Sequence, residues 1–214
     1  MVCDACVPFD PVHFEPGLDH PVPDDRVNDG RCGWALPGAL LEYHDTEWGR
    51  PVRGDQALFE RICLEAFQAG LSWRTVLLRR PDLREVFDGF DPHQLAQRDE
   101  DWVAAVLQDA RIIRNRAKVR AAIANARACL ELQAEHGPGA LDALIWRYAQ
   151  PDHPRPSGMD QVPAQTPQSF ALARQLRTSG FVFVGPTTAY ALMQACGLVN
   201  DHVIGCPVEI GECS

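Results

Sequence analysis

A histidine and a cysteine lie four residues apart near the end of the chain, in the segment "CGLVNDHVIGC" that spans residues 196–206. Four residues make one helical turn or one tight loop, so the side chains of His202 and Cys206 can face the same point. An imidazole and a thiol with a common reach suit half of a metal site. The spacing also fits a core histidine beside an ordinary buried cysteine, and this segment alone leaves both interpretations open.

A second candidate half-site lies near residue 40, where "RCGWALPGALLEYHDTEWG" supplies Cys32 and His44. With His202 and Cys206 these residues form a Cys₂His₂ set, the ligand number of a tetrahedral zinc site. Because four protein ligands leave no position for water, such a zinc would be structural rather than catalytic. It would tie the beginning of the folded body to its end. The alternative is four unrelated buried residues.

Positive charge is concentrated in residues 109–127, where six bases accompany one acid. Here the short segment "RIIRNR" connects two predicted helices, 99–110 and 116–136, which must then be antiparallel or steeply crossed. Amides and the dipole at a helix N-terminus bind phosphate well, so the segment predicts a helix-hairpin-helix contact with DNA, although charge runs are usually solvated helix faces. Lacking glycine, the turn is expected to place Asn115 in the left-handed conformation, and Ile112 and Ile113 are expected to be buried beneath it. The expected contacts with the DNA backbone are Ile113, Arg114, Asn115, Arg116 and Lys118.

Most of the predicted elements that position these residues are helices. Apolar spacing predicts a helix over residues 56–70, capped by Asp55. Further helices are predicted over 99–110, over 116–136 with Gly137 closing it, from Thr166-Pro167 towards Gly180, and after Pro186. The proline-rich segment 151–167 is a predicted loop, and strand-like alternation is confined to "FVFVG". The predicted fold class is all-α.

The composition of the 214 residues suits one domain with a substantial core, because 46% of the residues are hydrophobic. Residues 1–30 carry seven acids and one base without periodicity, which predicts a flexible acidic tail before a helical domain over 31–214. No segment has the length of a membrane span or the pattern of a secretory signal, so a cytoplasmic location is expected. The eight cysteines are then thiols or metal ligands, including the Cys3 and Cys6 pair in the tail.

Several motifs together resemble the type I 3-methyladenine DNA glycosylases of bacteria: "RCGW", "YHDTEWG", "ICLEAFQAGLSW", "DARIIRNRAKV" and "QACGLVNDHVIGC". The resemblance covers about residues 31–206. It implies a helix-hairpin-helix DNA glycosylase fold whose two ends are joined by one structural zinc, with Cys32, His44, His202 and Cys206 as ligands. The chain departs from the family pattern in the Cys32–His44 spacing, which is one residue shorter, and in Leu40, where some members have a tyrosine.

The resemblance also implies a pocket for the damaged base. It assigns Glu65 as the catalytic carboxylate and Tyr43, Trp34 and Trp73 as base-binding residues. Helical phase alone would not select Glu65, which lies at the flank of the apolar stripe of 55–70. Trp48, in contrast, is expected to pack in the core.

The implied reaction is monofunctional excision of 3-methyladenine from alkylated double-stranded DNA. An adenine methylated at N3 carries positive charge in the nucleotide, so the enzyme needs mainly to extract and distinguish the base before water hydrolyses the glycosidic bond. A lyase acting through a lysine Schiff base would depend on Lys118, the one lysine of the chain. The other alternative is a non-catalytic, zinc-stapled DNA-binding module. A monomer is expected.

Overall fold

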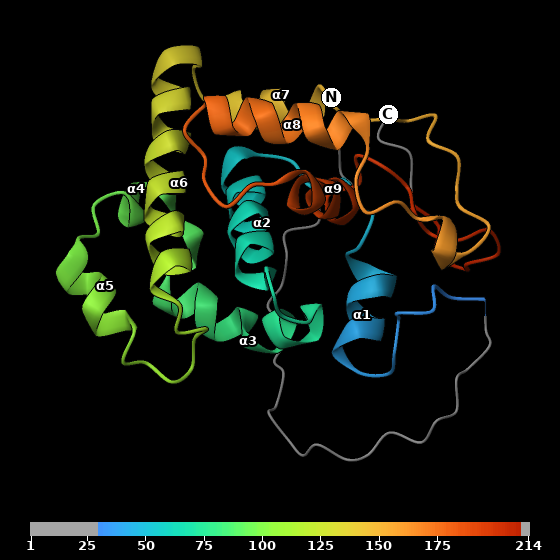
Figure 1. Cartoon of the computed structure of the whole chain (residues 1–214), viewed down its shortest axis with the longest axis horizontal. Helices are drawn as coiled ribbons and strands as arrows, with labels where there is room; N and C mark the ends of the chain where they lie inside the picture. Colours follow the sequence, from blue (N-terminus) through green and yellow to red (C-terminus); the bar gives the residue numbers. More distant parts are fainter. Residues whose placement is uncertain (1–29, 211–214) are drawn as a thin grey trace, which may run out of the picture.

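The computed structural model describes residues 30–210, so nearly all of the predicted acidic tail, with Cys3 and Cys6, lies outside the described residues. Every regular element within residues 30–210 is a helix, which confirms the predicted all-α class (Figure 1). The elements are α1 (Ala39–Thr46), α2 (Asp55–Gln68), α3 (Trp73–Val86), η1 (Asp88–Phe90), α4 (Pro92–Leu95), α5 (Glu100–Val106), α6 (Arg116–His136), α7 (Ala140–Trp146), η2 (Met159–Gln161), α8 (Pro167–Thr178) and α9 (Pro186–Ala195).

Capping residues set the ends of the long helices. Helix α8 begins where the sequence predicts, because the Thr166 side chain and Ser169 form a reciprocal capping box and Pro167 occupies the first turn. Helix α6 ends at Gly137, whose φ of 89° suits glycine and stops the helix. Helix α5 is shorter than the predicted 99–110: Asp99 caps its start, and the helix ends at Val106.

Asp55 does not cap α2, as the sequence suggested, but is its first residue, after Gly54. Its carboxylate instead accepts hydrogen bonds from the backbone N–H groups of Gly139 and Asp142, at 3.0 and 2.9 Å, at the start of α7. In return, the Asp142 carboxylate accepts from the N–H of Gly54 at 2.8 Å. The two aspartates therefore cap each other's helices, which is a tertiary arrangement that a local pattern does not contain.

Two other features of the structure differ from the sequence pattern. Helix α3 continues through Pro81, a residue that usually interrupts helices, and was not predicted. The alternating segment "FVFVG" forms no strand, since the described residues 30–210 contain none. Phe183 within it has a φ of 58°, which breaks the extended backbone that alternation requires.

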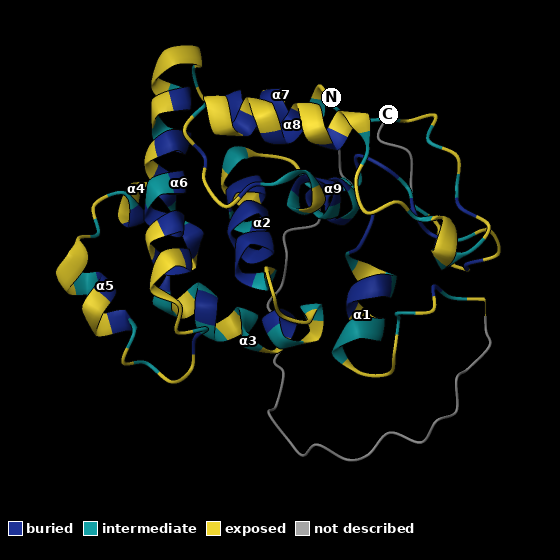
Figure 2. Ribbon diagram, viewed as in Figure 1, coloured by how far each residue is buried: buried dark blue, intermediate teal, exposed yellow. Residues whose placement is uncertain are grey.

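Helix α2 runs through the middle of the molecule and packs against α3, α6, α7 and α9 (Figures 1 and 2). Nine of its fourteen residues are buried, and two of them, Arg61 and Glu65, have ionisable side chains. A second, smaller core lies beside α1, where Tyr43, Trp48 and Leu77 pack with two cysteines, Cys32 and Cys206. Among residues 30–210, no helix is long and apolar enough to cross a membrane.

Candidate active site and metal centre

The four predicted metal ligands meet at one buried point. The ligand atoms of Cys32, His44, His202 and Cys206 all lie within 4.8 Å of one another. The Sγ atom of Cys206 is 3.6 Å from Nε2 of His44 and 3.4 Å from Nδ1 of His202, and the Cys32 sulfur is 3.9 Å from the same Nδ1. Two thiols and two imidazoles gathered at this spacing fit a tetrahedral ion such as Zn²⁺.

The outward-facing nitrogen of each histidine is also occupied. Nδ1 of His44 lies 2.7 Å from a carboxylate oxygen of Asp45, and Nε2 of His202 lies 3.1 Å from the carbonyl oxygen of Trp48. Such partners select the tautomer that directs the free nitrogen to a metal. Burial lowers the pKa of His202 to about 4, so this ring is neutral, the form that binds metal ions.

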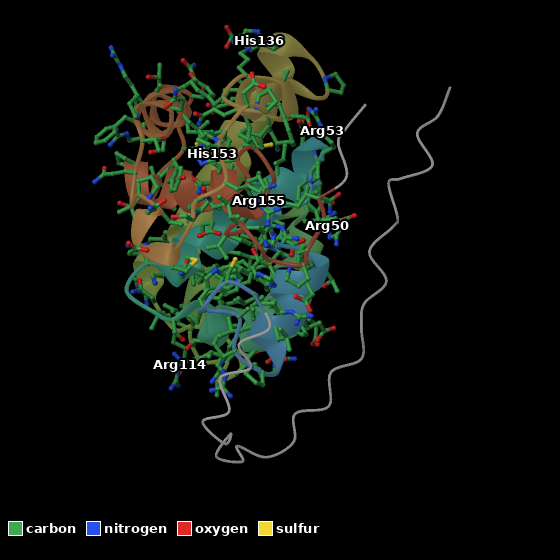
Figure 3. All side chains as sticks on the ribbon, turned by 90° about the vertical axis from the view of Figure 1, so that its right-hand side faces the viewer. Arg50, Arg53, Arg114, His136, His153 and Arg155 are labelled. Carbon is green, nitrogen blue, oxygen red and sulfur yellow. The ribbon has the colours of Figure 1, made fainter. Side chains whose placement is uncertain are left out.

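The loop that carries His202 and Cys206 is held from two sides. Asp201 is buried, and its carboxylate accepts hydrogen bonds from the Tyr190 hydroxyl and the Gln194 amide of α9, both at 2.7 Å. From the other side, the Arg155 guanidinium donates to the carbonyl groups of residues 202, 203 and 206 at 2.7–3.2 Å. Figure 3 shows Arg155 beside this loop. The sequence did not reveal Arg155, because its segment has no regular pattern.

Aromatic rings connect the metal centre to the predicted base-binding residues. The ring centroids of Trp34 and His44 are 5.2 Å apart, and those of Tyr43 and Trp73 are 5.3 Å apart. Trp34 also lies 6.3 Å from Tyr43, so the three predicted base-binding residues are neighbours. Trp48 is buried and stacks on His44, which confirms its expected place in the core.

Glu65 is buried in the last turn of α2, with 5% of its surface exposed. Its Oε2 atom has no hydrogen-bond partner, and neither has Nε1 of Trp73. Burial raises the pKa of Glu65 to about 8, although the charge of Arg61 lowers it in part. Buried polar atoms are almost always paired in a native fold, so an unpaired carboxylate oxygen and indole N–H indicate places where a ligand or water binds.

The connection between α5 and α6, which the sequence predicts to bind DNA, spans residues 107–115 and is longer than the predicted turn. Arg114 and Arg116 are exposed, Ile112 is buried and Ile113 is half-buried. Asn115 is not left-handed: its φ of −124° is extended, and its side chain caps α6 by accepting from the N–H groups of residues 117 and 118. Those two amides are therefore already occupied, since Asn115 is a favourable N-cap residue and fills the place a phosphate would take.

A lysine that contacts phosphate is expected to lie on the surface, but Lys118 does not. It is 5% exposed, and its Nζ donates to the carbonyl oxygens of Phe67 and Ala69 at 2.8 and 2.6 Å. These carbonyl groups belong to the end of α2, where the helix leaves its last acceptors without partners. Lys118 is therefore a buried cap of α2 rather than a surface residue.

A second helix pair also has a short connection. Helices α8 and α9 are joined by residues 179–185, and the N-terminus of α9 has no side-chain cap. Val182 and Phe183 in this connection are exposed, while the Asn125 side chain of α6 bonds both the N–H and the carbonyl of Val182. Both helices were predicted, and the glycines at 180 and 185 were the signal that could have identified this hairpin.

Comparison with known proteins decides the family. Residues 34–209 match the methyladenine glycosylase family. The chain belongs to this family. It is 46% identical over 179 residues to DNA-3-methyladenine glycosylase 1 of Escherichia coli, with 82% of the chain and 95% of that protein covered. The DNA-3-methyladenine glycosylase of Haemophilus influenzae is 43% identical, with 84% and 97% covered.

Solved structures of 3-methyladenine DNA glycosylase I share the fold of this glycosylase. A crystal structure that is 45% identical in sequence superposes with a TM-score of 0.79 and covers 83% of this chain and 98% of its own. A Staphylococcus aureus structure described as showing the basis of 3-methyladenine recognition has a TM-score of 0.79 at 28% identity, covering 84% and 95%. The family resemblance inferred from the motifs is thereby confirmed.

Proposed function

We propose that this glycosylase excises 3-methyladenine from alkylated DNA and that Glu65 is its catalytic carboxylate. The observation that carries the proposal is the unpaired carboxylate oxygen of buried Glu65, near Tyr43, whose ring in turn lies beside Trp73. The chain is 43–46% identical to two DNA-3-methyladenine glycosylases. A carboxylate in a dry, aromatic environment stabilises positive charge far better than one in water. A base that is cationic in the nucleotide is therefore a suitable ligand.

In the proposed reaction, the damaged base leaves the DNA stack and enters the space between the aromatic rings. Tyr43, Trp34 and Trp73 contact its faces, and Glu65 accepts a hydrogen bond from its amino group. As the glycosidic bond breaks, the bonding electrons move to the base, which leaves without its positive charge. Water adds to the sugar carbon and loses a proton, which leaves an abasic site.

A lyase mechanism has no suitable nucleophile in the described structure. The single lysine, Lys118, donates to two backbone carbonyl groups at the end of α2. Forming a Schiff base would require a neutral amine that can reach the sugar. This favours hydrolysis by water, and borohydride trapping of a covalent DNA adduct would contradict it.

The Cys₂His₂ cluster would hold one zinc ion through Cys32, His44, His202 and Cys206. A zinc ion with four protein ligands supplies structural cross-linking, which here would join Cys32 before α1 and His44 within α1 to the segment after α9. We propose that the protein acts as a monomer on double-stranded DNA in the bacterial cytosol. The proposed domain spans residues 31–214, after an acidic tail.

The test is release of free 3-methyladenine from methylated duplex DNA, with the metal content measured on the same sample. Wild type is expected to release the base and to contain about one zinc per chain. Glu65→Gln is expected to lower the rate by about 10²-fold or more, since it removes a negative charge from a dry site. The matched control is Glu60→Gln, on the same helix but paired with Arg84. A wild-type protein that bound DNA without releasing the base would instead be the non-catalytic module.

A further inference from the structure

A chain of ionisable side chains leads from Glu47, at the end of α1, through Arg61 to Glu65 on α2. Arg61 on α2 is 9% exposed, and its Nη2 donates to Oε2 of Glu47 at 2.9 Å. Arg80 of α3 donates to both oxygens of the same carboxylate, at 2.7 and 2.6 Å. Although burial alone would raise it, these two arginines lower the pKa of Glu47 to about 2. Glu47 is therefore ionised and holds Arg61 in place.

The other side of the Arg61 guanidinium is unpaired. Its Nη1 is buried and has no hydrogen-bond partner, and the same is true of Oε2 of Glu65. The two residues are four apart on α2, so their side chains lie on one face of the helix, one turn from each other. A buried cation and a buried carboxyl group on one face, each with an unsatisfied atom, form an electrostatic pair that the known site residues do not include.

We propose that Arg61 is a positioning residue for base excision: anchored by Glu47, its buried positive charge favours the ionised form of Glu65. The proposal rests on the role of Glu65 proposed above. Arg61 acts through Glu65 and need not touch the substrate.

The other titratable groups around Glu65 do not supply this charge. Tyr43 of α1 and Cys196 at the end of α9 are neutral, because burial raises the pKa of the tyrosine and raises that of Cys196 to about 12. On α6, Lys118 is bound to carbonyl groups at the end of α2. On α3, Arg80 is bound to Glu47. Within residues 30–210, Arg61 is the cation that lowers the pKa of Glu65.

A positioning role through charge has a specific kinetic signature. A nearby cation lowers the pKa of a carboxyl group, so removing it raises that pKa and moves the acidic limb of the activity profile to higher pH. The shift should appear mainly in kcat/KM, which reports the free enzyme. It should be smaller in kcat, because a bound cationic base itself favours the ionised carboxylate.

The experiment compares pH profiles of 3-methyladenine release by the full-length, metal-loaded protein. In Arg61→Met, the acidic limb of kcat/KM is expected to move to higher pH by about one unit. At pH values below the pKa of Glu65, this shift lowers kcat/KM roughly tenfold. Arg61→Lys keeps the charge and is expected to restore most of the wild-type profile. The matched control is Arg84→Met, which removes another arginine that bridges α3 and α2 through a glutamate, Glu60. The acidic limb of the kcat/KM profile of Arg84→Met should coincide with that of wild type.

The outcomes separate this proposal from the proposed function. If Glu65→Gln is inactive but Arg61→Met lowers activity equally at every pH, Arg61 is only structural and the proposal is wrong. If Glu65→Gln retains full activity, the role of Glu65 itself is wrong. Should Arg61→Met fail to fold, Arg61→Gln provides the test: it keeps an amide donor for Glu47 without the positive charge, so the acidic limb should again move to higher pH, and an unchanged limb would overturn the proposal.

Discussion

At the scale of single residues, burial gives Glu65 its properties. A glutamate has an ordinary pKa of about 4.3, and burial in α2 raises the pKa of Glu65 to about 8. The shift reflects the cost of holding a charge away from water. A site that holds this group near its titration point favours a ligand that brings positive charge, and this is the character of a methylated purine nucleotide.

The raised pKa of Glu65 predicts a pH-dependent effect on stability. Between about pH 4.3 and pH 8, the folded protein binds a proton at Glu65 that the unfolded chain releases, so its contribution to stability falls as pH rises. Glu65→Gln removes this dependence. The melting temperature of the variant relative to wild type should therefore increase steadily from about pH 5 to about pH 8. A difference that stays constant over this range would show that Glu65 is not buried as described.

Lys118 gives a second prediction at the scale of a residue. Lys118→Met should destabilise the protein by about 1–3 kcal/mol, because it leaves two buried carbonyl groups at the end of α2 without a donor. Denaturant unfolding measures this change. The salt dependence of DNA binding should stay the same, because the ammonium group is buried and neutralises no phosphate. If DNA binding by Lys118→Met depended less on salt than binding by wild type, Lys118 would be a contact to the DNA backbone after all.

At the scale of elements, two hairpins could contact the DNA backbone. The turn before α6 presents Arg114 and Arg116, while Asn115 occupies the helix amides. The turn before α9 has no side-chain cap and carries two exposed apolar residues, Val182 and Phe183. The turn before α6 offers positive charge, whereas the turn before α9 offers free amides at a helix N-terminus. Contacts made by charged side chains depend more on salt, so the salt dependence of DNA binding distinguishes the two turns.

Changes in each turn separate these contributions. The double variant Arg114→Ala/Arg116→Ala should weaken DNA binding at low salt and reduce the slope of log K against log salt by about two. Phe183→Glu places a negative charge beside the N-terminus of α9 and should weaken binding about tenfold or more. Phe170→Glu, at a somewhat more exposed site near the start of α8, is the matched control. If Phe170→Glu and Phe183→Glu have the same effect, the turn before α9 is not a specific contact.

At the scale of the whole molecule, the Cys₂His₂ cluster joins the two ends of the described chain. Residue 32 precedes all the helices and residue 206 follows all of them. Closing so long a loop lowers the entropy of the unfolded chain, and the burial of the four ligands requires a partner for their polar atoms. The metal centre should therefore matter for stability more than for the chemical step.

Removal of the metal tests this expectation. Chelation, or Cys206→Ser, should release zinc and lower the melting temperature by at least several degrees, as loss of a ligand that binds only the folded state does. Cys129→Ser changes a buried cysteine outside the cluster and should keep the metal. A chelated protein that loses its ion but keeps its melting temperature would contradict a structural role.

The sequence alone indicated the family and the helical class, because these depend on residue types at short spacings. The caps at Thr166 and Gly137 needed no knowledge of distant contacts, whereas the two halves of the Cys₂His₂ set were assigned to one site only through the family resemblance. Only the tertiary structure decided which face of α2 is enclosed, and with it the burial of Glu65 and Lys118. It also decided the pairing of Arg61 with Glu47 and of Asp55 with α7. These depend on elements far apart in the chain, and the free energy of a charged group depends on what surrounds it in space rather than on its neighbours in sequence.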